Sequence, residues 1–274
     1  MNTNRKSGVS ILAMAALLSA GMTSCSSDNR GGEAADGTAC LNVCLKGNGR
    51  FSRALSESDW NTAANYNVEI INSSAEVIKT FVQGEMPERI TVPYGTYTVR
   101  ASYGEQKVAS RDTFLSTGET TVNVASGEEK TVNVECAPTC GKVMVQFDAS
   151  MPTYYSDYYV DFTTPQMPAG TVAKWVSTDT EPWYLAVGET GDKVTATIHL
   201  TPKAEYDTNK THTDGSQSDG TIVRQYTLQR NKAWTLKVTA TYDSSQGEMN
   251  GVRVTIDESV TEDVYDEEVP ITWM

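Results

Sequence analysis

The chain has 274 residues, with 22 Lys or Arg and 35 Asp or Glu, so its formal net charge is −13. No basic run offsets this charge, and repulsion therefore disfavours nucleic acid and anionic membrane surfaces as partners. The length suits two domains, each able to bury about two-thirds of its unfolded surface, so the fold needs no cofactor to build a core.

Residues 1–24 are predicted to be an export signal. A basic start precedes the apolar run Val9–Ala20, which is too short to span a bilayer of ~30 Å. Small residues then lead to Cys25 as in a bacterial lipobox, with Met22 where Leu is commoner. We predict that Cys25 is lipidated, becomes the first mature residue and anchors the chain in the outer membrane at the cell surface. The alternative is an ordinary signal peptide that happens to contain a cysteine.

The next segments alternate between polar linkers and strands. Residues 25–37 are rich in Ser, Gly and Asp and predict a flexible tether. Apolar residues alternate over 40–46, which indicates a first strand. Residues 47–64 predict a long loop with at most one helical turn. Two further strands are expected at 66–72 and 76–83.

Residues 87–103 contain the clearest strand pattern of the chain. Apolar and polar residues alternate on both sides of the break Pro93-Tyr94-Gly95. This pattern predicts two strands that meet at a tight turn, each with one buried face. The sequence Thr-Val-Asn-Val then occurs at 121–124 and again at 131–134, which predicts a hairpin.

The best predicted domain boundary is Ala137-Pro138-Thr139, because a proline cannot donate a ladder hydrogen bond. It divides the mature chain into β-sandwich domains at 38–137 and 138–274. Alternation predicts further strands at 142–147, 154–163, 171–177, 183–187, 193–201, 222–229, 234–242 and 252–256. An acidic run precedes a last alternating segment that contains Val269, Ile271 and Trp273.

These motifs together resemble a known family. The lipobox, the strand CLNVCL, the segment FSRAL and above all the turn VPYGTYTV are similar to the fimbrillin-like surface lipoproteins of the Bacteroides group, in the family named domain of unknown function 4493. The resemblance covers most of residues 38–165. It implies an all-β fold of two tandem sandwiches, Ig-like or transthyretin-like, related in build to pilus subunits that assemble by exchanging strands. The activity of the family is unknown, so the resemblance implies place and architecture rather than chemistry.

Little in the sequence points to catalysis. The chain has two histidines, His199 in an expected strand and His212 in a polar loop, and neither comes with a metal-ligand pair. Residues 207–220 carry Asp and Asn that would suit calcium, but they lack the EF-hand spacing. We therefore expect no enzyme, no metal and no cofactor.

Two pairs of residues are candidates for other roles. Tyr155 and Tyr159 share a strand face and could form an outward platform for glycans, although aromatic residues are also common in strands for packing alone. Arg50 and Arg53 follow the first strand. The resemblance to pilus subunits implies that cleavage at an arginine there could remove that strand, although an ordinary surface loop explains both residues as well.

Export predicts at least one disulfide, because the compartment is oxidising. Cys40 and Cys44 cannot pair within one extended strand, since four residues span ~13 Å and disulfides join Cα atoms less than ~7 Å apart. Cys136 shares a face with buried valines and could be a reduced thiol. The expected pair is Cys140 with Cys40 or Cys44.

The predicted function is a non-enzymatic surface lipoprotein for adhesion or fimbria-like assembly, as a subunit, tip or anchor. Its partners would be other fimbrillin-like subunits or host ligands. In assembly, strand 269–273 of one subunit could replace the first strand of another; alternatively, both terminal strands pair within their own sandwiches. The alternative function is a glycan-binding lipoprotein of a polysaccharide uptake system.

Overall fold

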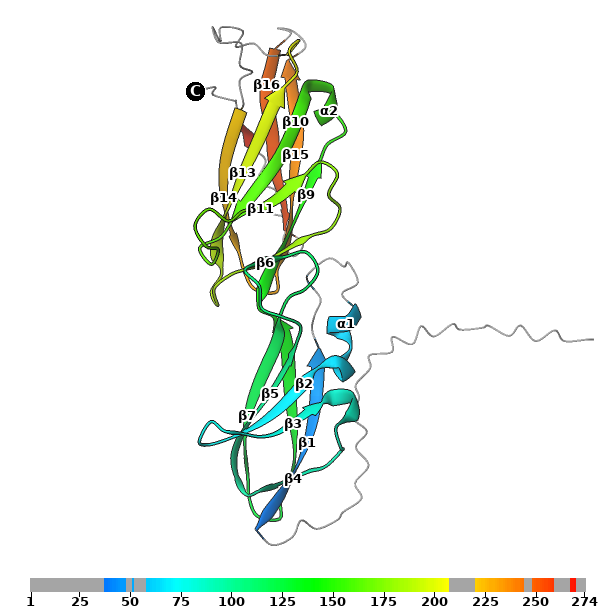
Figure 1. The fold of residues 1–274 in the computed structure, drawn as a ribbon, viewed down its shortest axis with the longest axis vertical. Helices are drawn as coiled ribbons and strands as arrows, with labels where there is room; N and C mark the ends of the chain where they lie inside the picture. Colours follow the sequence, from blue (N-terminus) through cyan, green and yellow to red (C-terminus); the bar gives the residue numbers. More distant parts are fainter. Residues whose placement is uncertain are drawn as a thin grey trace, which may run out of the picture.

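The fold is built almost entirely from strands. The structure is a computed structural model that describes residues 37–47, 51, 58–206, 220–243, 248–258 and 267–269. Figure 1 shows an elongated molecule in which two groups of strands follow each other along the long axis. We call them the first lobe, which contains β1 to β5, β7 and β8, and the second lobe, which contains the other strands. The all-β prediction is confirmed.

The first lobe is one seven-stranded sheet in the order β3-β2-β5-β7-β8-β1-β4, folded into two layers. Its strands are β1 (Thr38–Gly47), β2 (Asn67–Asn72), β3 (Val77–Val82), β4 (Ile90–Pro93), β5 (Gly95–Tyr103), β7 (Ser116–Val124) and β8 (Glu129–Pro138). β8 pairs with β7 only at 116–117 and 137–138, and with β1 along its length. The layers β3-β2-β5-β7 and β8-β1-β4 therefore enclose a common core, to which Leu41, Ile70, Val99 and Val134 belong.

Short helices lie in the connections between strands of both lobes. They are α1 (Ser58–Asn61), the 3-10 helices η1 (Ala63–Asn65) and η2 (Gln83–Glu85), and α2 (Met151–Tyr154). We expect at most one helical turn between 47 and 64, and both α1 and the start of η1 lie there.

The break in residues 87–103 is a corner between the two layers. β4 pairs with β1, whereas β5 pairs with β2 and β7, so the chain changes layers at Tyr94. Gly95 has a φ of 152°, which residues with a side chain rarely adopt. The Tyr97 hydroxyl donates a hydrogen bond to the Pro93 carbonyl oxygen at 2.8 Å. The spacing of Pro, Gly and Tyr in this turn thus follows from the geometry of the corner.

The hairpin prediction for the two Thr-Val-Asn-Val copies is wrong in its pairing. Val122 of β7 and Val132 of β8 are both buried in the core, but the second copy pairs with β1 instead of the first copy. The two strands separate because each joins a different layer. They still approach closely at Gly118, where a Cβ atom would overlap the Glu135 carbonyl oxygen of β8. A side chain at this position would prevent β8 from crossing between layers.

The second lobe is a sandwich of two sheets. One has the order β11-β10-β13-β14, and the other has the order β17-β16-β15-β9-β12-β6. Its strands are β6 (Ala109–Ser110), β9 (Cys140–Phe147), β10 (Tyr155–Thr163), β11 (Ala173–Val176), β12 (Trp183–Ala186), β13 (Asp192–Pro202), β14 (Gly220–Leu228), β15 (Ala233–Asp243), β16 (Glu248–Glu258) and β17 (Glu267–Val269). Their inward residues, among them Val143, Phe162, Trp175 and Ile198, form the second large core.

Two features join the lobes. Only Thr139 separates β8 from β9, so these strands follow each other almost without interruption. β6 precedes Thr139 in sequence but pairs with β12 of the second lobe, at Ser110 opposite Tyr184. The chain from the first half of the sequence thus reaches across to the second lobe.

Candidate functional site

The first strand, β1, lies between two neighbours rather than at an edge. It pairs in parallel with β8 over eight residue pairs, from Cys40 opposite Glu129 to Gly47 opposite Cys136. On its other side it pairs antiparallel with β4 over four residue pairs. Its inward side chains Ala39, Leu41 and Val43 are buried in the core. Backbone pairing and apolar burial thus act together on one ten-residue strand.

Side chains add polar contacts to the β1–β8 pairing. The Asn42 side chain amide donates to Glu129 Oε1 at 2.8 Å, and Arg89 Nη2 lies 2.8 Å from Glu129 Oε2. Glu129 therefore links β8 to β1 and to the segment before β4. Lys46 and Glu135 form a second ion pair at 3.4 Å, but both side chains are about three-quarters exposed, so its contribution is small.

The segment after β1 is anchored where the lobes meet. Phe51 is 2% exposed, and its ring centroid lies 5.3 Å from that of Phe114 and 5.6 Å from that of Tyr184. Trp60 stacks on Phe114 at 4.4 Å and donates to its carbonyl oxygen. The buried Lys142 ammonium lies 5.6 Å from the Phe51 ring centroid. Because Tyr184 belongs to β12, Phe51 contacts both lobes.

Arg111 provides a second connection between the lobes. It follows β6 and donates to the carbonyl oxygens of Glu181 and Lys174 and to the carboxylate of Asp179. Its guanidinium also lies 4.3 Å from the ring centroid of Trp183. Bonds to charged groups and stacking on a flat ring are contacts that suit arginine better than lysine.

Several predicted site residues lie outside the described residues. These are Cys25, Arg50, Arg53, Ile271 and Trp273. Val269 is described as the last residue of β17, where it pairs with Val252 of β16. The start of the predicted donor strand is therefore paired with a strand of its own chain.

The expected disulfide of Cys140 with Cys40 or Cys44 is wrong. Cys40, Cys136 and Cys140 are buried reduced thiols. The parallel register explains this, because Cys44 lies opposite Asn133, seven residues before Cys140 along β8 and β9. Seven extended residues span ~23 Å, and a disulfide requires Cα atoms within ~7 Å. Cys40 lies farther away still.

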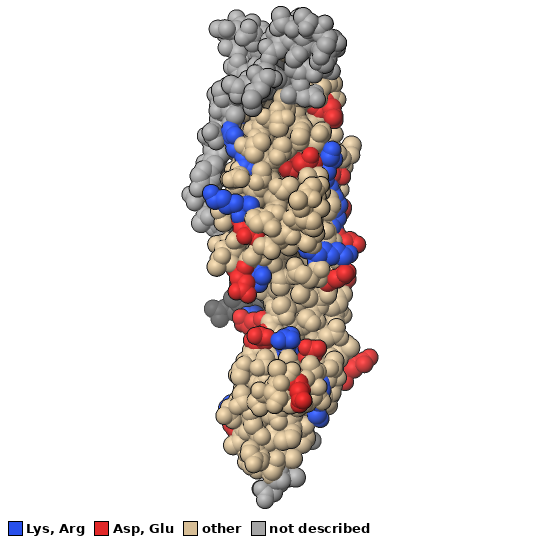
Figure 2. Space-filling view, turned by 60° about the vertical axis from the view of Figure 1, so that its left-hand side comes forward, with Lys and Arg blue, Asp and Glu red and all other residues tan. Residues whose placement is uncertain are grey.

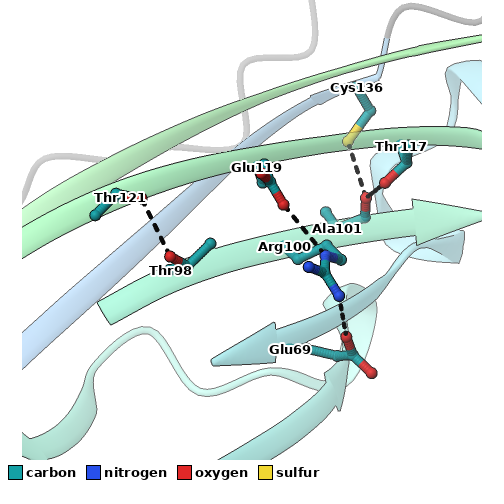
Figure 3. A network of polar contacts seen from close by, with 8 residues as sticks. All are labelled: Glu69, Thr98, Arg100, Ala101, Thr117, Glu119, Thr121 and Cys136. Atoms are coloured by element: carbon teal, nitrogen blue, oxygen red, sulfur yellow. Dashed lines mark hydrogen bonds and ion pairs between the residues drawn. The ribbon is translucent and has the colours of Figure 1, made fainter. Parts of the chain in front are cut away.

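The interpretation of Cys136 as a buried thiol is confirmed. Figure 3 shows its sulfur and the Thr117 hydroxyl on the carbonyl oxygen of Ala101, at 3.8 and 2.9 Å. Burial raises the pKa of the Cys136 thiol to about 12. The same figure shows Arg100 of β5 between Glu69 of β2 and Glu119 of β7. The three side chains form exposed ion pairs on the outer face of the sheet.

Tyr155 and Tyr159 do not form an outward platform. A bulge between Tyr155 and Asp157 shifts the register of β10 against β13, so Tyr155 turns into the core and is 2% exposed. Tyr159 faces outward, but its ring stacks on His199 of β13 at 4.3 Å, and the Lys174 ammonium of β11 lies 3.7 Å from its centroid. Since β11 and β13 flank β10 on opposite sides, neighbouring side chains cover the ring from both directions.

Charge patches, metal-ligand groups and membrane spans are further features that could mark a site on the described surface. On the face shown in Figure 2, acidic and basic side chains are interspersed. Among the described residues, no three His, Cys, Asp or Glu side chains are grouped so that they could hold a metal ion. No described helix combines the length and apolar character needed to cross a membrane. His199 lies 3.3 Å from Asp161 as part of the outward row on the sheet.

The comparisons with known proteins identify the family. Residues 40–271 match the family described as Domain of unknown function (DUF4493). The chain belongs to this family. The match extends well past residue 165, so the second lobe is part of the family fold as well. No curated protein matches the chain in sequence.

The chain is similar to several solved structures at low sequence identity. A candidate cell adhesion protein from Bacteroides eggerthii is 13% identical, with a TM-score of 0.50, and the alignment covers 89% of this chain and 98% of that one. A fimbrial assembly protein from Parabacteroides distasonis is 10% identical, with a TM-score of 0.41 and coverage of 85% and 98%. Candidate polysaccharide-binding proteins from Bacteroides thetaiotaomicron are 10% identical, with a TM-score of 0.42 and the same coverage.

Sequence reasoning missed the residues that connect the lobes. Phe51 had one signal, since it is an isolated aromatic residue in a polar, glycine-containing segment. Arg111 and Lys142 had none, because charged residues are ordinarily exposed.

Proposed function

We propose that this chain is a non-enzymatic surface lipoprotein that acts in adhesion, held at the outer membrane through lipidated Cys25. Membership of the DUF4493 family and the fold shared with a candidate cell adhesion protein support this proposal. The observation that carries it is the position of β1. Its first residues lie at one end of the elongated molecule, and α2 lies toward the other end (Figure 1). An anchor before β1 would place the far end of the second lobe away from the membrane.

Two tandem sandwich domains fit this role, because two cores form on either side of Thr139. The lobes would extend the reach of the protein, and the contacts of Phe51 and Arg111 would keep them aligned. A lipid-anchored protein of this build could serve as an adhesin, or as the tip or anchor of a fimbria-like assembly.

Within this proposal, β1 stays in its own sheet. Burying a Leu or Val side chain contributes about 1.5–3 kcal/mol, so Leu41 and Val43 together contribute about 3–6 kcal/mol. A whole domain is stable by only about 5–15 kcal/mol. Loss of β1 would also leave ladder groups of β8 and β4 unpaired. Assembly by strand exchange therefore needs both a cut after β1 and a donor strand that replaces these contacts.

The alternative function in glycan uptake depended on an outward platform of Tyr155 and Tyr159, which the two residues do not form. Tyr155 is buried and Tyr159 is covered by Lys174 and His199. Stacking aromatic residues supply much of the affinity in such sites, and with Tyr155 buried the two tyrosines form no paired platform.

Cells that express either the native chain or the Cys25→Ala variant test the proposal. Equal thermal unfolding of the native chain and the variant verifies that the substitution keeps the fold. We expect the native protein to carry acyl mass after membrane extraction and to support attachment of cells to host surfaces or to other cells. The variant should lack the acyl mass and the attachment. Equal attachment of both strains, or an unmodified native chain, would refute the proposal.

A further inference from the structure

The direction of β1 relative to β8 determines how the molecule would respond to tension. The two strands are parallel, so Thr38 and Glu129 start near the same end of the first lobe. The Gly127 amide donates to the Thr38 carbonyl oxygen at 2.7 Å, which places the turn before β8 beside the start of β1. The two strands thus begin side by side and both run toward the second lobe (Figure 1).

A pull on the tether acts on the start of β1, whereas resistance from the second lobe acts on the end of β8. In this geometry the strands can separate only by sliding along their common axis. All eight residue pairs then share the load and must break together, because the force runs parallel to the strands. If both strands were pulled from the same end, the pairs would instead break one after another.

The same arrangement continues in the second lobe. β9 follows β8 after Thr139, whose amide is held by the Leu115 carbonyl oxygen at 2.9 Å. β9 pairs in parallel with β15 over six residue pairs, from Lys142 opposite Ala233 to Phe147 opposite Val238. Tension that enters the second lobe from β8 would therefore load the β9–β15 pairing in shear as well.

We propose that β1, β8, β9 and β15 form a continuous load-bearing path along the long axis. The inference deepens the proposed function, because an anchored adhesin that binds at its far end carries tension along this axis. The path depends on two parallel pairings and on the short Thr139 connection. The load resistance is a property of the isolated protein and does not depend on which ligand the far end binds.

Single-molecule pulling on the full mature chain tests the path. One handle is fixed at the N-terminus. The second is a clickable amino acid placed either at Ala149, beyond the end of β9, or at Ala125, in the turn between β7 and β8. Both alanines are exposed, so neither substitution removes a core contact. Equal thermal unfolding of the two labelled proteins and the native chain verifies that the fold is kept.

Pulling through Ala149 loads the β1–β8 pairing in shear, and pulling through Ala125 peels it open from one end. We expect the first lobe to resist several times more force in the Ala149 geometry than in the Ala125 geometry at the same pulling rate. Equal forces in the two geometries would overturn the proposal. This result would leave the proposed role in adhesion untouched, because attachment of Cys25→Ala cells is measured separately.

Discussion

β1 and β9 occupy the same position in their respective lobes. Each is the first long strand of its lobe and lies between a parallel and an antiparallel neighbour, β8 and β4 for β1, and β15 and β12 for β9. They differ in their connection to the chain. β9 is joined to β8 through one residue, whereas β1 is followed by a segment that includes Phe51 before α1 begins. The comparison distinguishes two contributions that keep a strand in place, its pairing with neighbouring strands and its covalent connection to the next segment.

The largest expected effect concerns Phe51, which connects the segment after β1 to both lobes. Phe51→Ala would open a cavity between Phe114 and Tyr184 and cost about 3–5 kcal/mol. Thermal and denaturant unfolding measure this loss. Tyr94→Ala is the matched control, because Tyr94 is 63% exposed and its loss should change stability by less than about 0.5 kcal/mol. Similar stabilities of the two variants would show that Phe51 does not hold the junction.

A pair of glycines compares the two lobes, since Gly118 lies in β7 of the first lobe and Gly141 lies in β9 of the second. A Cβ at Gly118 would overlap the backbone carbonyl of Glu135, whereas a Cβ at Gly141 would overlap the side chain of Leu228. Backbone cannot move aside as a side chain can. We therefore expect Gly118→Ala to cost about 3 kcal/mol or more and Gly141→Ala about 1–3 kcal/mol. If urea unfolding shows a smaller loss of stability for Gly118→Ala than for Gly141→Ala, this account of the layer crossing is contradicted.

The strand pattern of the sequence was sufficient to predict most elements and their buried faces. Alternation identifies faces because successive side chains point to opposite sides of a sheet. It does not identify neighbours, so the parallel pairing of β1 with β8 and the separation of β7 from β8 could not be predicted. The predicted pairing of Cys140 with Cys40 or Cys44 failed for the same reason, since it depended on where Cys44 lies along β8.

The candidate site was harder to predict, because it depends on local irregularities. One extra residue in the bulge at Tyr155 reverses which face the tyrosine joins. Phe51 and Lys142 are buried by contacts between segments far apart in sequence. No periodic pattern records such contacts.

The smallest expected effect concerns the buried thiols, two of which lie on β1 and β9. Cys40 of β1 and Cys140 of β9 are 5% and 3% exposed. Burial also raises the pKa of Cys136 to about 12, so the reactive thiolate is scarce at pH 8 and becomes available only when the fold opens. We expect iodoacetamide to label these three cysteines slowly in the native protein and rapidly in urea. Rapid native labelling of Cys40 alone would indicate that β1 opens more readily than β9.

The most direct test of the central claim, that pairing and burial hold β1 in place, is to cut the chain after β1. Limited trypsin digestion at Arg50 or Arg53 provides the cut, and hydrogen exchange with mass spectrometry then compares β1 with β9. We predict that the fragment containing β1 stays bound during size exclusion, that the protein remains a monomer, and that the amides of β1 stay as protected as those of β9. Release of the fragment, rapid exchange confined to β1, or oligomers that form after the cut would contradict the account and favour assembly by strand exchange.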